Sequence, residues 1–195
     1  MGKNVTCVLC NHKFGCRQIY EHYDQCVIDK CISDNRSGYL VRFFSNGLSK
    51  EPYFIYAIVG AKCTFEDVDQ FLRNVWCECC EHLSEFTDSS QKTISETDLL
   101  NKYNVKDQIK YEYDMGSMTT IYLIILHKFD DNGEDIEVVL RNDPRIFICS
   151  QCKKNDATFF DEETEPICDH CVGDNDSGEL LKIVNSPRTG ICGYS

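Results

Sequence analysis

The spacing of apolar residues along the chain predicts several β-strands. One stretch is apolar at almost every position, which indicates a central strand in a sheet that is covered on at least one side, and the others alternate or form long apolar runs. An Asn-Gly pair at 132–133 stands between the last two stretches and is typical of a tight hairpin. The predicted strands cover residues 39–45, 53–59, 110–114, 118–129 and 135–140.

Residues 64–86 instead carry a helical pattern. Thr64 followed three residues later by Asp67 resembles a capping box, and acidic residues suit the first turn of a helix. The apolar residues that recur at steps of three and four are Phe65, Val68, Leu72, Val75, Trp76, Cys79 and Leu83. We predict a helix of about four to five turns that lies across the sheet. The polar connector 87–109 is expected to hold one short helix at 96–102.

These elements predict an α+β domain over residues 32–145, a mostly antiparallel sheet with one main helix packed on it. The chain has 195 residues, 42% of them apolar, which is enough for a core and a small module at each end. No apolar run reaches the ~18 residues of a membrane span, and the start lacks a signal peptide's long apolar region. We therefore expect a cytoplasmic protein without membrane contact, in which the fourteen cysteines are metal ligands and buried thiols rather than disulfides.

The first 31 residues predict a small zinc finger. Cys7 and Cys10 form a Cys-x-x-Cys knuckle, and His22 and Cys26 are four apart, on one face of a helix. Four nitrogen and sulfur ligands suit a tetrahedral zinc ion. The pattern resembles the short Cys-Cys-His-Cys zinc-finger family. Cys16 is an alternative ligand, and a chance arrangement in a cysteine-rich chain is the other interpretation.

Residues 146–195 predict a zinc ribbon and a turn-rich tail. Cys149-x-x-Cys152 is followed after fifteen residues by Cys168-x-x-Cys171, a spacing typical of four-cysteine zinc sites. Four protein ligands leave no open position on zinc, so the site is expected to be structural. Iron in a rubredoxin-like site is the alternative. Together the two modules imply two structural Zn²⁺ ions in the chain.

Three central segments resemble a known family. They are Thr64-Phe-Glu-Asp-Val-Asp-Gln-Phe-Leu72, Cys79-Cys-Glu-His-Leu-Ser-Glu-Phe86 and Tyr111-Glu-Tyr-Asp-Met-Gly-Ser117. They resemble the plasmid pRiA4b ORF-3-like family, whose members are often labelled insertion-element passenger proteins. The resemblance spans roughly residues 39–145 and is similar to a branch with a cysteine-rich C-terminal segment. It implies an α+β fold rather than an activity, and it carries over no catalytic residues.

The end of the predicted helix, 76–86, is the one further cysteine cluster. Cys79 belongs to the apolar stripe, where cysteine commonly serves as a small buried side chain, so a core helix with buried thiols is the preferred interpretation. Cys80 and His82 lie at the end of this helix and could face Cys192 of the tail. They form the alternative, a third metal site or a Cys/His catalytic centre.

A net charge of −12 disfavours nucleic-acid binding, which usually relies on a basic patch. The first 31 residues, with four basic and three acidic residues, are the exception, but their exposed helix face would carry Arg17, Gln18, Glu21 and Asp24. We therefore predict a zinc-binding, non-enzymatic recognition or adaptor protein that contacts an unidentified protein partner. A nucleic-acid-binding protein linked to mobile elements is the first alternative, and an enzyme using Cys80 and His82 is the second. No small-molecule substrate is indicated.

Overall fold

The fold was analysed in a computed structural model that describes residues 4–6, 9–10, 13–15, 19–48, 52–77, 81–173 and 180–191, with backbone only for 4–6, 13–15 and 19–20. The helical segments are α1 (Ile19–Ser33), α2 (Phe65–Leu72), the π-helical turn η1 (Arg73–Cys77) and the 3-10 turn η2 (Leu100–Lys102). The central strands are β3 (Tyr39–Ser45), β4 (Tyr53–Val59), β5 (Ser84–Thr87), β6 (Gln108–Tyr113), β7 (Thr119–Lys128) and β8 (Ile136–Arg141). The terminal strands are β1 (Asn4–Thr6), β2 (Lys13–Gly15), β9 (Phe159–Phe160), β10 (Pro166–Ile167) and β11 (Leu181–Lys182).

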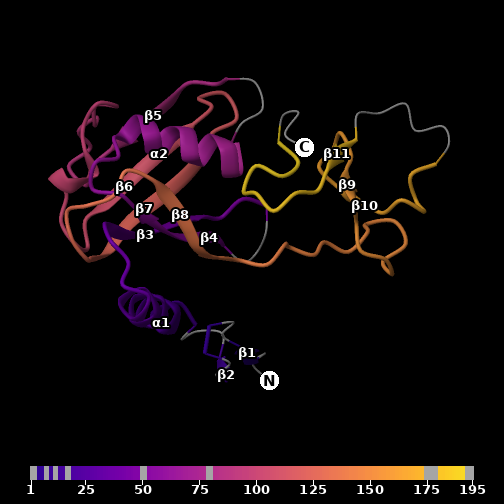
Figure 1. Ribbon diagram of the computed structural model, residues 1–195. Helices are drawn as coiled ribbons and strands as arrows, with labels where there is room; N and C mark the ends of the chain where they lie inside the picture. Colours follow the sequence, from indigo (N-terminus) through magenta and orange to yellow (C-terminus); the bar gives the residue numbers. More distant parts are fainter. Residues whose placement is uncertain are drawn as a thin grey trace.

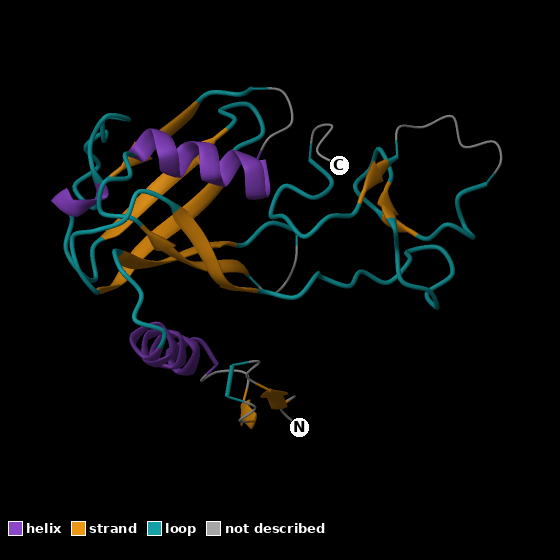
Figure 2. Ribbon diagram, in the orientation of Figure 1, coloured by secondary structure: helices purple, strands orange, loops and turns teal. Residues whose placement is uncertain are grey.

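The central strands form one six-stranded sheet in the order β5-β6-β7-β3-β4-β8, with every neighbouring pair antiparallel. The predicted α+β class, a mostly antiparallel sheet with few helices, is confirmed. In Figures 1 and 2, α2 crosses one face of this sheet and α1 lies beneath the other. Cysteine-rich groups that could hold metal ions lie near both ends of the chain.

The predicted hairpin at 132–133 is wrong, because β8 pairs with β4 at the far edge of the sheet and not with β7. The connector instead crosses the adjoining ends of β3 and β4. The N–H groups of Ala61 and Lys62 donate to the carbonyls of Asn132 and Gly133 at 2.9 and 3.1 Å. A Cβ atom on Gly60 would lie 2.3 Å from the carbonyl carbon of Gly133, so this crossing requires glycine. Gly133 takes a left-handed conformation with φ of 93°, but tertiary contacts decide which strand β8 pairs with.

The predicted helix begins as expected and ends early. Thr64 and Asp67 form the full capping box, with the Asp67 N–H 3.2 Å from Thr64 Oγ1 and the Thr64 N–H 2.7 Å from Asp67 Oδ2. α2 then passes into η1, which ends at Cys77, and the prediction that the helix continues as far as Leu83 is wrong, because residues 81–83 are not helical. Residues 84–87 form edge strand β5, which satisfies the outer backbone groups of β6. Leu83, expected on the buried stripe, is 78% exposed. Of the short helix expected at 96–102, only η2 forms.

Each face of the sheet carries its own apolar core. The α2 side buries the main cluster, which includes Trp76 and the β6 residues Tyr111 and Tyr113. The opposite face packs Val27 and Cys31 of α1 against β3, β4 and β8. Asp24 of α1 accepts hydrogen bonds from Arg42 at 2.7 and 2.8 Å and from Tyr56 at 2.7 Å. Part of the helix surface expected to face a nucleic acid is therefore bound to the sheet.

The C-terminal strands form a separate three-stranded sheet in the order β10-β9-β11. β11 pairs with β9 in the ribbon and not with a strand of the central domain. The chain after β11 then turns back to the central sheet (Figure 1). There the hydroxyl of Ser186 donates to the carbonyl of Trp76 at 2.7 Å, which ties the tail to the end of η1.

Candidate metal centres

The four cysteines of the C-terminal pattern lie together. The Sγ atoms of Cys149, Cys152, Cys168 and Cys171 all lie within 4.8 Å of one another, and those of Cys152 and Cys168 are 3.9 Å apart. A zinc ion bound at about 2.3 Å to four sulfurs in a tetrahedron would hold them about 3.8 Å apart. The four thiols therefore fit a tetrahedral site and could hold one metal ion.

Two tight backbone turns bring these sulfurs together. In the first turn the N–H of Lys153 donates to the Cys149 carbonyl at 3.0 Å, and Lys153 takes the left-handed conformation with φ of 56°. In the second turn the N–H groups of Cys171 and Val172 donate to the Cys168 carbonyl at 2.8 and 3.1 Å. Each Cys-x-x-Cys pair therefore presents both sulfurs on the same side of its turn.

The backbone around the first turn favours thiolates. Hydrogen bonds from backbone N–H groups, above all that of Cys152, lower the pKa of Cys149 to about 6. The N–H groups of Asn155 and Lys154 likewise lower the pKa of Cys152. Burial, reinforced by the sulfurs around it, raises the pKa of Cys171 to about 12. The first turn therefore stabilises thiolates, the form in which cysteine binds a metal ion.

Apart from Phe160, which packs on Phe147 with ring centres 5.1 Å apart, the ribbon has little else to hold it together. Its strands β9, β10 and β11 have two residues each, and its apolar cluster consists of Ile167 and cysteines with a few partly buried side chains around them. So small a core cannot supply the free energy of folding unaided. Metal binding by the four thiols would supply it.

The N-terminal group has three of its four predicted ligands in place. Cys10 Sγ lies 3.4 Å from His22 Nε2, and Cys10, His22 and Cys26 have ligand atoms within 4.8 Å of one another. His22 and Cys26 lie one turn apart on α1, as predicted. The other predicted ligand, Cys7, and its alternative, Cys16, lie outside the described residues. Three ligands can hold a metal ion, and a fourth would close the site.

The third cysteine cluster is only partly described. The residues that fall outside the described part are Cys79, Cys80 and Cys192. Trp76 and Cys77 are fully buried, in agreement with the core-helix interpretation for this end of η1. His82 lies beyond the helix, with Nε2 3.5 Å from Asp114 Oδ2 and its ring 5.7 Å from that of Tyr113. A carboxylate therefore faces the histidine.

Among the described residues, Arg188 of the tail is the most deeply buried charged side chain, and the sequence does not indicate this burial. Its side chain is fully buried, and Nη2 lies 2.9 Å from Asp114 Oδ2. Nη1 donates to the Ser117 carbonyl and to Thr119 Oγ1, both at 3.1 Å, and the guanidinium lies 4.9 Å from the centre of the Tyr113 ring. Burial acts against ionisation of Asp114, but hydrogen bonds from the Ser117 N–H and Arg188 outweigh it and lower its pKa. A buried ion pair thus docks the tail.

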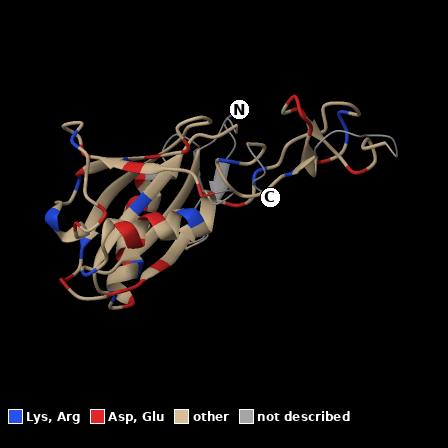
Figure 3. Ribbon diagram, turned by 90° about the horizontal axis from the view of Figure 1, so that it is seen from above, with Lys and Arg blue, Asp and Glu red and all other residues tan. Residues whose placement is uncertain are grey.

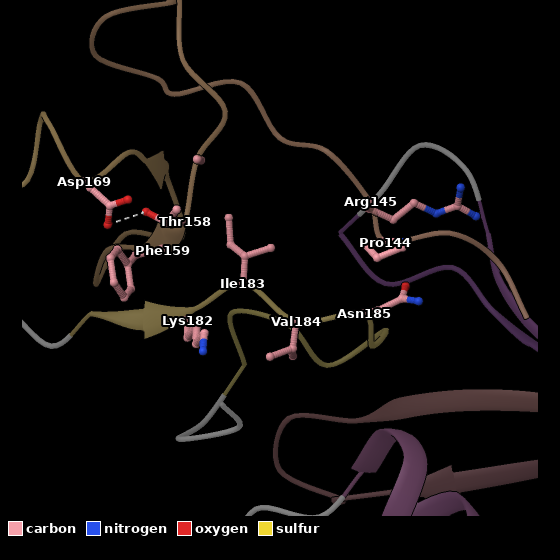
Figure 4. Close-up of a pocket in the computed structure, with 10 residues that line it drawn as sticks. Pro144, Arg145, Thr158, Phe159, Asp169, Lys182, Ile183, Val184 and Asn185 are labelled. Carbon is pink, nitrogen blue, oxygen red and sulfur yellow. Dashed lines mark hydrogen bonds between the residues drawn. The ribbon is translucent and has the colours of Figure 1, made fainter.

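A cavity of about 500 Å³ lies where the ribbon meets the central domain. Pro144 and Arg145 of the connector line one side, and Ile183, Val184 and Asn185 line the other (Figure 4). Its one carboxylate, Asp169, accepts a hydrogen bond from Thr158 at 3.1 Å. In Figure 3 the Lys and Arg residues do not gather into one continuous patch, and Asp and Glu lie among them. The cavity is lined by two cations, Arg145 and Lys182, beside the carboxylate of Asp169, and Arg145 donates a hydrogen bond to the Pro52 carbonyl.

Comparisons with known proteins do not identify a family for this chain. No family model matches the chain, and no curated protein matches it. One solved structure with similarity is the crystal structure of a protein of unknown function, MM3350, from Methanosarcina mazei Go1, with 18% identity and a TM-score of 0.39. The match covers 52% of this chain and 61% of that protein, so it spans about three fifths of the length of MM3350. Among the described residues, no helix combines the length and apolar character of a membrane span.

Proposed function

We propose that the protein is a zinc-stabilised recognition or adaptor protein that contacts another protein and carries out no chemistry at its metals. The set of four cysteine sulfurs within 4.8 Å of one another carries this proposal. Four thiolates saturate tetrahedral zinc, which leaves no position for a substrate or a water molecule. A second structural zinc would be bound by Cys10, His22 and Cys26 with Cys7 as the fourth ligand.

Charge favours a protein partner over a nucleic acid. The chain carries 32 acidic and 20 basic residues, and zinc-bound thiolates would add further negative charge. On α1 the side chain of Asp24 already binds Arg42, and Glu21 is exposed. The proposal that the central domain belongs to the plasmid pRiA4b ORF-3-like family rests on the three segments that resemble it.

Protein purified without added metal should contain about two zinc ions per chain by elemental mass spectrometry, one per cysteine-rich group. A value of about one would remove the N-terminal site, and iron in place of zinc would support the rubredoxin-like alternative.

The same preparation should not shift single- or double-stranded DNA or RNA in a mobility assay at low salt. Salt-sensitive retardation would replace the protein-contact proposal with the nucleic-acid one.

The pairing of His82 with Asp114 favours the second candidate, a Cys/His centre. Such catalysis needs a base and a group that orients it, and Asp114 lies where an orienting carboxylate would be. If Cys80 is the nucleophile, its alkylation should be fast at neutral pH and should slow at least about tenfold in His82→Gln. The control is Cys63, a buried thiol whose pKa burial raises, which should react slowly in both proteins. Equally slow alkylation of Cys80 would remove this candidate.

A further inference from the structure

Three large apolar side chains stand together in solvent at one end of the central sheet. Leu83, Met115 and Met118 are 78%, 54% and 56% exposed. The N–H of Asp114 donates to the Leu83 carbonyl at 2.9 Å, and Met118 directly precedes β7 at the next strand end. With about 4.8 Å between strands, Leu83 and Met118 lie about 10 Å apart. Contiguous exposed apolar groups of this kind mark interaction sites more often than isolated ones do.

The adjoining face of the sheet is only partly covered by α1. α1 packs on the half formed by β3, β4 and β8, and among the described residues no member of that apolar cluster comes from β5 or β6. The residues of β6 that face away from α2 are Lys110 and Glu112, because the alternate residues Tyr111 and Tyr113 lie in the main core. The apolar group therefore adjoins a part of the sheet whose described residues lack contact with the apolar cluster of α1, where the side chains of Lys110 and Glu112 are 26% and 19% exposed.

Two carboxylates lie beside this apolar group on the same face of the sheet. Glu85 of β5 and Glu112 of β6 are directly opposite each other, so their side chains point to the same side. Lys110 pairs with Glu112 at 3.0 Å. Glu85 accepts a hydrogen bond from Thr93 at 2.8 Å, and no lysine or arginine of the described residues pairs with it. Like charges directly opposite each other destabilise a sheet, so this surface favours an added cation.

We propose that Leu83, Met115, Met118, Glu85 and Glu112, which we name the Leu83 patch, dock a basic amphipathic segment of a partner protein. The apolar side of the segment would cover the leucine and methionines, and a lysine or arginine would neutralise Glu85. Methionine adapts its shape to different apolar surfaces and is enriched at interfaces. This inference rests on the proposed function, a protein contact, and names the surface that makes it.

The same charges disfavour other ligands. A nucleic acid or an anionic lipid surface would bring phosphates against two carboxylates that have one lysine between them. An acidic peptide would meet the same repulsion. The sign of the partner's charge is therefore the feature that separates this proposal from its alternatives.

The chain offers a direct probe, because two of its three methionines lie in the Leu83 patch. In the full zinc-loaded chain with ¹³C-labelled methionine methyl groups, Met1 is the internal reference. The probe is a synthetic helix of about eighteen residues with leucine on one face and lysine on the other. We expect it to shift the methyl signals of Met115 and Met118 and to leave that of Met1 in place. The matched peptide with glutamate for lysine should shift neither.

Variants locate the contact. Leu83→Ser should weaken binding of the lysine peptide at least about tenfold. The double variant Glu85→Gln and Glu112→Gln should weaken peptide binding several-fold and reduce the salt dependence of that binding. The matched control is Ile146→Ser, since Ile146 is 73% exposed and follows β8, the strand at the opposite edge of the sheet from β5, so its loss should change nothing. Unshifted Met115 and Met118 signals, equal binding of both peptides, or full binding by Leu83→Ser would overturn the proposal. A cross-linked protein complex that survives Leu83→Ser would overturn it while leaving the proposed function intact.

Discussion

Replacing Cys168 by serine should unfold the ribbon while the central sheet stays folded. The ribbon's two-residue strands and small apolar cluster leave the metal as its main source of stability. The apparent free energy of zinc binding in finger peptides is ~10–16 kcal/mol, and a site with three ligands retains only part of this binding free energy. We expect the zinc content to fall from about two to about one and the amides of 147–173 to lose protection from hydrogen exchange.

His170→Asn is the matched control for this variant. His170 lies inside the same Cys-x-x-Cys turn as Cys168 but is exposed and is not a member of the four-cysteine group. Its replacement should leave both the zinc content and the protection of the ribbon unchanged. If Cys168→Ser kept two zinc ions or a protected ribbon, the four-cysteine site would not be what holds this segment together.

Features set by local spacing could be predicted from the sequence. The two Cys-x-x-Cys turns need only the residues between their own cysteines, and the Thr64 cap needs only residues within one turn, so both were found. The strand pairing of β8 could not be predicted, since the Asn-Gly signal at 132–133 is equally suited to a crossing loop. The apolar pattern at 83–86 is too short to distinguish a helix from a strand. This segment forms a strand because it pairs with the outer edge of β6.

The partner of Arg188 and the burial of its ion pair could not be predicted from the sequence for a different reason. Its partner Asp114 is 74 residues away and is held in a turn with φ of 62°, where its Oδ1 accepts from the N–H groups of Gly116 and Ser117. Neither residue lies in a local sequence pattern that indicates the other as its partner. The tail also packs on the ribbon, because a Cβ atom at Gly190 would lie 2.8 Å from Phe160 Cδ2. One short segment therefore contacts both the ribbon and the central domain.

Arg188→Met should destabilise the protein by about 3–5 kcal/mol in urea unfolding, because it leaves Asp114 buried without its cation. Arg188→Met combined with Asp114→Asn should recover part of this loss, since neither buried charge remains. Asparagine also tolerates the left-handed backbone and can keep the turn's hydrogen bonds. The exposed pair Lys62–Glu134 provides the control, and Lys62→Met should change stability by less than about 1 kcal/mol.

The loss of stability caused by Arg188→Met should also depend on pH, and it should become smaller as the pH falls. The folded protein lowers the pKa of Asp114 below its ordinary value of about 4, so the ion pair contributes its full stability above that pH. As pH falls below about 4 toward the lowered pKa, the contribution is lost and the wild type should approach the variant. Hydrogen exchange at residues 186–191 reports the same event locally, because these amides should open in Arg188→Met at neutral pH while those of β6 and β7 stay closed. A difference that grew toward acidic pH, or a tail that stayed protected in the variant, would show that the ion pair does not hold the tail in place.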